Sequence, residues 1–141
     1  MTVPIVDITH REDFSAAHRL HCDSLSAEEN LALYGPCNTL HGHNYGVEVT
    51  LRGPVDPVTG MVINLVDLMR VMREEIFDAC DHKFLNEDVP WLVGLVPTAE
   101  VLAIAFWDRV AARRSDLGDS EMTRVRVIES RNNFVDYHGP S

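Results

Sequence analysis

The sequence has no uninterrupted apolar stretch of the roughly 18 residues that a membrane-spanning helix needs, so we expect no membrane segment. It also has few cysteines. There are three, Cys22, Cys37 and Cys80, with no CxxC pair among them. An odd count without such spacing argues against a disulfide framework and favours a reducing compartment. The first residues lack the charged and apolar regions of a secretory leader, so we expect a cytoplasmic protein.

Basic residues are scarce as well. Twelve Lys and Arg stand against 22 Asp and Glu, which gives a net charge of −10, and the only lysine is Lys83. Nucleic-acid binding needs a basic surface, so we expect no nucleic-acid partner. A polyanion could bind only where cations, a metal or helix N-termini converge locally.

A length of 141 residues with 45% hydrophobic content fits one globular domain over residues 1–141. Extended or alternating apolar patterns predict four strands, at residues 3–20, 43–53, 122–129 and 134–137. In the second of these, one face carries Tyr45, Val47, Val49 and Leu51.

Apolar residues at helical spacing predict two main helices. One follows Asn64 and runs to about residue 79, and the other follows Thr98 and runs to about residue 114. Ser26 and Glu29 have the spacing of a capping box for a short extra helix, and residues 80–97 are predicted to be a loop. The order ββααββ predicts an α+β fold with a four-stranded antiparallel sheet and both helices on one face.

The seven histidines include a pair that suits metal binding. His41 and His43 flank Gly42 just before the second strand, and residues i and i+2 of an extended segment point to the same side. His18 lies at the end of the first strand and joins them if the two strands pair. Three histidines with an open fourth position are typical of a catalytic zinc site.

Cys37, four residues before His41, has two interpretations. As a fourth ligand it would close a structural zinc site, and as a thiolate it would act as a base beside the metal. Asp81-His82 is a candidate pair to activate that thiol. Glu129 is the last residue of the alternating strand 122–129, so it is either solvent-facing or an acceptor for the N–H donors of a guanidine-like ring edge.

Taken together in this order and spacing, segments along nearly the whole chain resemble the 6-pyruvoyltetrahydropterin synthase family. Each alone is a weak signal. They are Phe14 to Leu20, Leu25 to Asn30, Cys37 with His41 to Tyr45, Thr59 to Val62, Asp81-His82-Lys83, Pro97 to Glu100, and Glu129 with Asn133.

The resemblance implies a tunnelling fold (T-fold). Three four-stranded sheets close into a trimeric barrel, and two trimers stack into a homo-hexamer. Barrel closure also removes the exposed sheet edges that promote aggregation.

The resemblance further implies a lyase that acts on 7,8-dihydroneopterin triphosphate, with one zinc per subunit held by His18, His41 and His43. Cys37 would move protons on the substrate side chain, activated with Asp81 and His82. Glu129, helped by Thr98, would anchor the pterin ring. Triphosphate would be eliminated and the side chain would tautomerise to a pyruvoyl group.

Two alternatives stay open at this stage. The short spacing from Cys37 to His41 and the sequence Phe84-Leu85-Asn86 are similar to 6-carboxytetrahydropterin synthases of queuosine biosynthesis, which release acetaldehyde as well as triphosphate. A zinc-containing pterin-binding protein without turnover is the other, although an intact Cys37, Asp81 and His82 set argues against a mere binder.

Overall fold

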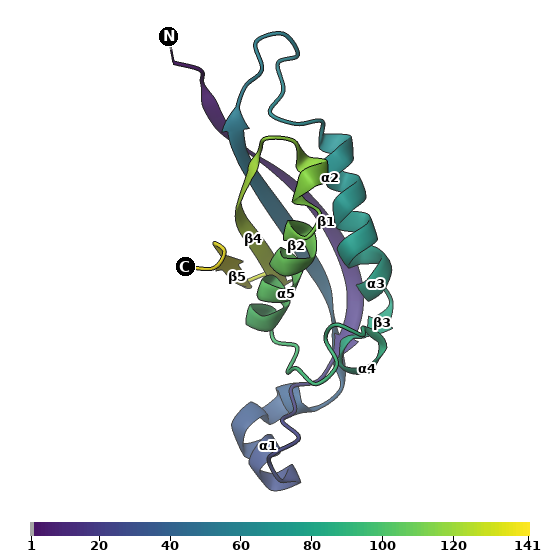
Figure 1. Cartoon of the computed structure of the whole chain (residues 1–141). Helices are drawn as coiled ribbons and strands as arrows, with labels where there is room; N and C mark the ends of the chain where they lie inside the picture. The colour runs from purple at the N-terminus through teal and green to yellow at the C-terminus, as the bar shows by residue number, and fades with distance from the viewer. Residues whose placement is uncertain (1) are drawn as a thin grey trace.

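Two long antiparallel strands lie side by side within the sheet (Figure 1). A computed structural model describes residues 2–141. Strand β1 covers Ile5–His18 and β2 covers His41–Pro54. They pair without interruption from Ile5 opposite Pro54 to His18 opposite His41. This register places the end of β1, with His18, beside the start of β2, with His41 and His43, at one end of the sheet.

The sheet has five strands in the order β3-β1-β2-β4-β5. Strands β4, Glu121–Ser130, and β5, Asn133–Tyr137, extend the antiparallel pattern. The two-residue strand β3, Lys83–Phe84, pairs with β1 in parallel. The expectation of a purely antiparallel four-stranded sheet is therefore wrong at this edge, because a short segment of the predicted 80–97 loop adds a strand beside Ala16 and Ala17.

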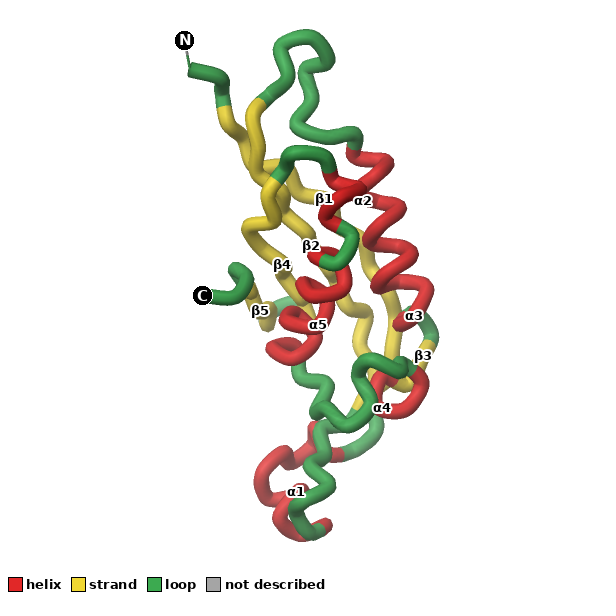
Figure 2. Tube along the Cα trace, viewed as in Figure 1, coloured by secondary structure: helices red, strands yellow, loops and turns green. Residues whose placement is uncertain are grey.

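The helices pack on one face of the sheet, as predicted (Figures 1 and 2). Helix α2, Leu65–Met72, continues through a π-helical turn, Arg73–Phe77, into α3, Asp78–Cys80. Helix α5, Ala99–Ala111, begins at the predicted cap Thr98, whose Oγ accepts the Val101 amide. The core between the layers includes Tyr45, Val47, Val49, Leu51, Leu68, Met72, Leu102 and Phe106, all with no exposed surface.

Shorter elements surround this core. Helix α1, Ala27–Tyr34, has the predicted capping box of Ser26 and Glu29 and leads into a 3₁₀ turn, Gly35–Asn38. Helix α4, Leu85–Asp88, lies in the segment expected to be a loop, and a second 3₁₀ turn covers Arg114–Leu117. Within residues 2–141, every helix is too short or too polar to cross a membrane.

Candidate metal centre

Three imidazoles meet at the end of the β1–β2 pair. His18 lies opposite His41 in the strand register, and His43 lies two residues further along β2. One nitrogen from each ring falls within 4.8 Å of the other two. The ring centroids are 4.6, 5.1 and 4.9 Å apart. The predicted histidine cluster is confirmed, and its geometry follows directly from the i, i+2 spacing and the strand pairing.

Two backbone carbonyls orient the rings of this cluster. His18 Nδ1 donates to the carbonyl of Pro97 at 2.8 Å, and His41 Nδ1 donates to the carbonyl of Thr39 at 2.6 Å. Because a carbonyl only accepts, both neutral rings carry their proton on Nδ1 and present the lone pair of Nε2 to the centre. Fixing the tautomer in this way is a recurrent feature of metal-bound histidines.

The inward nitrogens fit a cation. The Nε2 atoms of His18 and His41 lie 3.0 Å apart. Two lone pairs at that distance repel unless a proton or a metal lies between them. His43 Nε2 is buried without a hydrogen-bond partner among residues 2–141. Three imidazole nitrogens facing one another are a donor set that binds zinc, so the residues present fit a metal.

Burial also favours the neutral, metal-binding form of the histidines. His18 is 1% exposed, and burial lowers its pKa, although its bond to Pro97 partly opposes this shift. Burial likewise lowers the pKa of His43. Beneath them, the fully buried Tyr45 has its pKa raised by burial and stacks on Phe14. The cluster therefore lies against a fully buried aromatic side chain.

Glu129 lies beside the cluster, on strand β4. One of its carboxylate oxygens is 3.9 Å from Nε2 of His43, and its side chain is 28% exposed. Its neighbours Val125 and Val127 alternate into the core, and Glu129 continues on their side of the strand. Glu129 thus borders the histidine cluster while part of its side chain remains exposed, and its role as an acceptor for a ligand stays a prediction.

The other predicted catalytic residues do not form a single cluster with the histidines. Cys37 is exposed in the 3₁₀ turn after α1. His82 follows α3, and its Nδ1 contacts the Asp81 carboxylate at 2.9 Å with 82% of the side chain exposed. Among residues 2–141, the structure has no hydrogen bond between Cys37 and this pair.

The Asp81-His82 pair is nevertheless held firmly. Asp81 accepts the Ser15 amide at 3.0 Å, and this bond, with the His82 contact, lowers the pKa of its carboxyl. The His82 backbone has a φ of 61° and donates to the Ser15 carbonyl. A left-handed backbone at a residue other than glycine costs about 1 to 3 kcal/mol and is common at functional sites.

Thr98, the remaining predicted site residue, follows Pro97, whose carbonyl orients His18. Its hydroxyl is the N-cap of α5. Thr98 therefore directly follows a residue that contacts the cluster, and its hydroxyl has a structural task in capping α5.

The orienting groups of the centre were not predictable from the sequence. The carbonyls of Thr39 and Pro97 belong to the backbone, which any residue supplies. Asn86 has a role that the sequence did not indicate, although it belongs to the Phe84-Leu85-Asn86 segment noted above: its side-chain amide bonds both the N–H and the C=O of Arg19, directly after His18.

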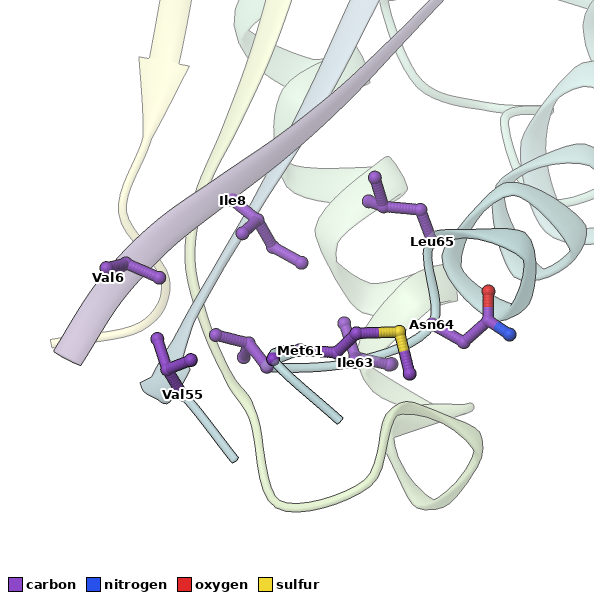
Figure 3. Close-up of a pocket in the computed structure, with 9 residues that line it drawn as sticks. Val6, Ile8, Val55, Met61, Ile63, Asn64 and Leu65 are labelled. Atoms are coloured by element: carbon purple, nitrogen blue, oxygen red, sulfur yellow. The ribbon is translucent and has the colours of Figure 1, made fainter. Parts of the chain in front are cut away.

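An apolar cavity of about 360 Å³ opens at the other end of the sheet, between the start of β1 and the segment before α2 (Figure 3). It is lined by Val6, Ile8, Val55, Gly60, Met61, Val62, Ile63, Asn64 and Leu65. None of these side chains titrates, so this cavity offers no group for acid–base or metal chemistry.

Comparison with known proteins gives a consistent result. The family model described as 6-pyruvoyl tetrahydropterin synthase matches residues 7–140. The 6-pyruvoyl tetrahydrobiopterin synthase of Poecilia reticulata is 48% identical, covering 94% of this chain and 89% of that protein. The solved structure of Caenorhabditis elegans 6-pyruvoyl tetrahydropterin synthase superimposes with a TM-score of 0.88 at 37% identity, covering 99% of this chain and 100% of that one.

A protein of Archaeoglobus fulgidus, provisionally named 6-carboxy-5,6,7,8-tetrahydropterin synthase, is more distant. It is 30% identical and covers 80% of this chain and 88% of that protein.

Proposed function

The chain belongs to the 6-pyruvoyl tetrahydropterin synthase family, and on that premise we propose that it is a zinc-dependent lyase that removes triphosphate from 7,8-dihydroneopterin triphosphate. The side chain of the pterin then tautomerises to a 6-pyruvoyl group. The observation that carries the proposal is the convergence of three oriented histidines next to the Glu129 carboxylate.

His18, His41 and His43 hold one zinc per chain through their Nε2 atoms. A metal held by these three residues would supply Lewis acidity that lowers the pKa of hydroxyl groups on the substrate side chain. The Pro97 and Thr39 carbonyls keep the rings in place before substrate arrives.

Glu129 anchors the pterin ring. The 2-amino group and ring N–H of a pterin form a donor pair that a carboxylate accepts through both oxygens. Glu129 already lies 3.9 Å from His43, so a ring bound there points its side chain toward the metal. Thr98 borders the same space from the start of α5.

Cys37 moves protons on the substrate side chain, and Asp81 holds His82 so that its ring can activate the thiol. Since Cys37 has no bond to that pair within the described chain and the His82 ring is exposed, a second copy of the chain is the natural source of the pair. This arrangement requires an oligomer.

The sheet itself favours a homo-oligomer. Strand β1 pairs with β3 only at Ala16 and Ala17, which leaves most of its outer edge, from residue 5 to 15, without a strand partner in the described chain. Strand β5 forms the opposite edge. Joining the β1 edge of one copy to the β5 edge of another closes a barrel, and we propose the trimeric barrel and the stacked hexamer on this basis. The three free thiols suit the cytoplasm.

A 6-carboxytetrahydropterin synthase remains the second candidate. It would use the same metal and the same ring anchor, and the spacing of four residues from Cys37 to His41 favours it. The two reactions differ only in the fate of the substrate side chain. The products that this protein forms therefore decide between them.

A mass-resolved product assay tests the function. The purified zinc-loaded protein is incubated with 7,8-dihydroneopterin triphosphate, and we expect triphosphate together with a pterin that keeps its three-carbon side chain as a diketone. Acetaldehyde and a one-carbon carboxylate on the ring would establish the second candidate instead. No turnover by a folded, zinc-loaded sample would exclude both. His41→Ala should lose metal and turnover, whereas the control His10→Ala, outside the cluster, should keep both.

A further inference from the structure

Cys37 lies in a segment that little else holds in place. The 3₁₀ turn Gly35–Asn38 contains no buried residue, and helix α1 before it buries only Asn30. Packing therefore cannot fix the position of the thiol relative to the metal centre. Hydrogen bonds must do so.

Those bonds connect the turn to the two residues that follow the metal ligand His18. The Leu20 amide donates to the Cys37 carbonyl at 2.8 Å. Asn38 Nδ2 donates to the Leu20 carbonyl at 2.9 Å, and Arg19 Nε donates to the Asn38 carbonyl at 3.1 Å. Three bonds in both directions thus link residues 19–20 to residues 37–38.

This link is not a continuation of the sheet. The β1–β2 register ends with His18 opposite His41, and continuing it would place Leu20 opposite Thr39. Leu20 instead meets Cys37, which comes two residues before Thr39. The Asn38 side chain supplies a bond where the regular ladder has stopped.

Resting on the proposed function, we propose that Asn38 is a positioning residue for Cys37. Its side-chain amide, with the Arg19 guanidinium, sets the distance from the thiol to the metal-bound substrate by fixing residues 37–38 to the chain just beyond His18. Asn86 completes the arrangement from the other side, since it bonds the backbone of Arg19 through both atoms of its amide.

The same turn also orients a ligand, because the Thr39 carbonyl holds His41. If the loss of Asn38 disturbed the ligand His41, the zinc content would fall. If it disturbed only the position of Cys37, the zinc content would stay unchanged, so the zinc content separates the two effects.

The test compares Asn38→Ala with Asn64→Ala. Asn64 caps α2 at the opposite end of the sheet, where its side chain accepts the Val66 amide, so the control loses a similar bond far from the site (Figure 1). Zinc content, kcat and KM for 7,8-dihydroneopterin triphosphate are measured for each. Hydrogen exchange of the Leu20 amide reports the link directly.

For Asn38→Ala we expect one zinc per chain, a KM within about twofold of the wild type, a kcat lowered at least tenfold, and Leu20 exchange at least tenfold faster. Asn64→Ala should leave all four unchanged. Arg19→Lys, which keeps the charge but loses the Nε donor, should lower kcat in the same direction.

Unchanged kcat and unchanged Leu20 exchange in Asn38→Ala would overturn the proposal, as would a loss that appears in KM or in zinc content. If the wild-type enzyme itself proved inactive, the proposed function would fail, while the exchange measurement would still decide whether Asn38 fixes the turn.

Discussion

At the scale of single residues, the surroundings favour one charge state at each of three groups. Burial lowers the pKa of His18 and of the partly buried His43, and the Ser15 amide together with His82 lowers the pKa of the Asp81 carboxyl, which lies apart from the histidine cluster. Neutral imidazoles are metal ligands, and an ionised carboxylate orients a histidine for proton transfer. These pKa directions agree with the roles that we propose for the three residues.

Replacing Cys37 with alanine separates its two predicted roles. As a proton-transfer group, its loss should lower kcat by about 10² to 10⁴-fold while metal content stays at one per chain. Metal analysis and steady-state kinetics measure both quantities, with Cys22→Ala as the control. Loss of the metal together with the fold would instead identify Cys37 as a structural ligand.

Glu129→Gln tests the ring anchor. A neutral amide presents one acceptor and one donor group where the carboxylate presents two acceptors, so we expect pterin affinity to fall by about 1.5 to 3 kcal/mol. Calorimetric titration with a pterin measures this change. Glu121→Gln, on the exposed start of the same strand, is the matched control. Equal affinity of Glu129→Gln and the wild type would remove Glu129 from the substrate site.

The ligands were predictable at this scale, whereas the groups that orient them were not. The spacing of His41 and His43 fixes their common side by the geometry of any extended chain, and one strand pairing adds His18. Asn38, Asn86 and the Pro97 carbonyl make contacts between segments that are separated in the sequence, which no local pattern marks. The Thr39 carbonyl contacts His41 only two residues away, but any residue would supply the same backbone group.

At the scale of elements, periodicity correctly located the long strands and helices because each buries one side. Tyr45, Val47, Val49 and Leu51 alternate in the sequence and are all fully buried. Strand β3 was missed because two residues are too few to show a period, and its pairing with β1 depends on where α3 ends. The π-helical turn between α2 and α3 likewise has no signature in the helical pattern.

The β4–β5 pair carries an electrostatic prediction. Arg126 bonds Asp136 through two nitrogens at 2.6 and 2.9 Å, and this contact lowers the pKa of the Asp136 carboxyl. A pKa lower in the folded than in the unfolded state stabilises the fold fully above the unfolded value of about 3.9. That stabilisation disappears as pH falls through the folded value.

Asp136→Asn should therefore lower the free energy of unfolding by about 1 kcal/mol at pH 7, and the deficit should shrink below about pH 3.5. Urea unfolding of the wild type and of Asp136→Asn across this pH range measures the difference between their free energies of unfolding. Effects of pH that are common to both proteins cancel in this difference. Asp119→Asn, at an exposed position without an ion pair in the described chain, should show neither effect. A deficit that stays constant with pH would contradict the assignment.

At the scale of the whole molecule, the parts of the site occupy separate places. The histidine cluster and Glu129 lie where β1 ends, β2 begins and β4 ends, whereas Cys37 belongs to the turn after α1 and Asp81-His82 follows α3. In the described chain, β1 has a long edge that is largely unpaired, and β5 forms the opposite edge of the sheet. Copies of the chain can join through these two edges. Assembly thus completes both the sheet and, by our proposal, the catalytic set.

Mixing two inactive variants tests this idea. Cys37→Ala and His82→Ala should each be inactive alone. When they are unfolded and refolded together, random assembly gives about a quarter of the sites an intact Cys37 from one chain and an intact His82 from another, so about a quarter of the activity should return. Analytical ultracentrifugation should give a mass near six times the 15.9 kDa of one chain. If mixed particles of that mass recover no activity, Cys37 works with His82 of its own chain. If the active wild type has the mass of a monomer, a site shared between chains is excluded.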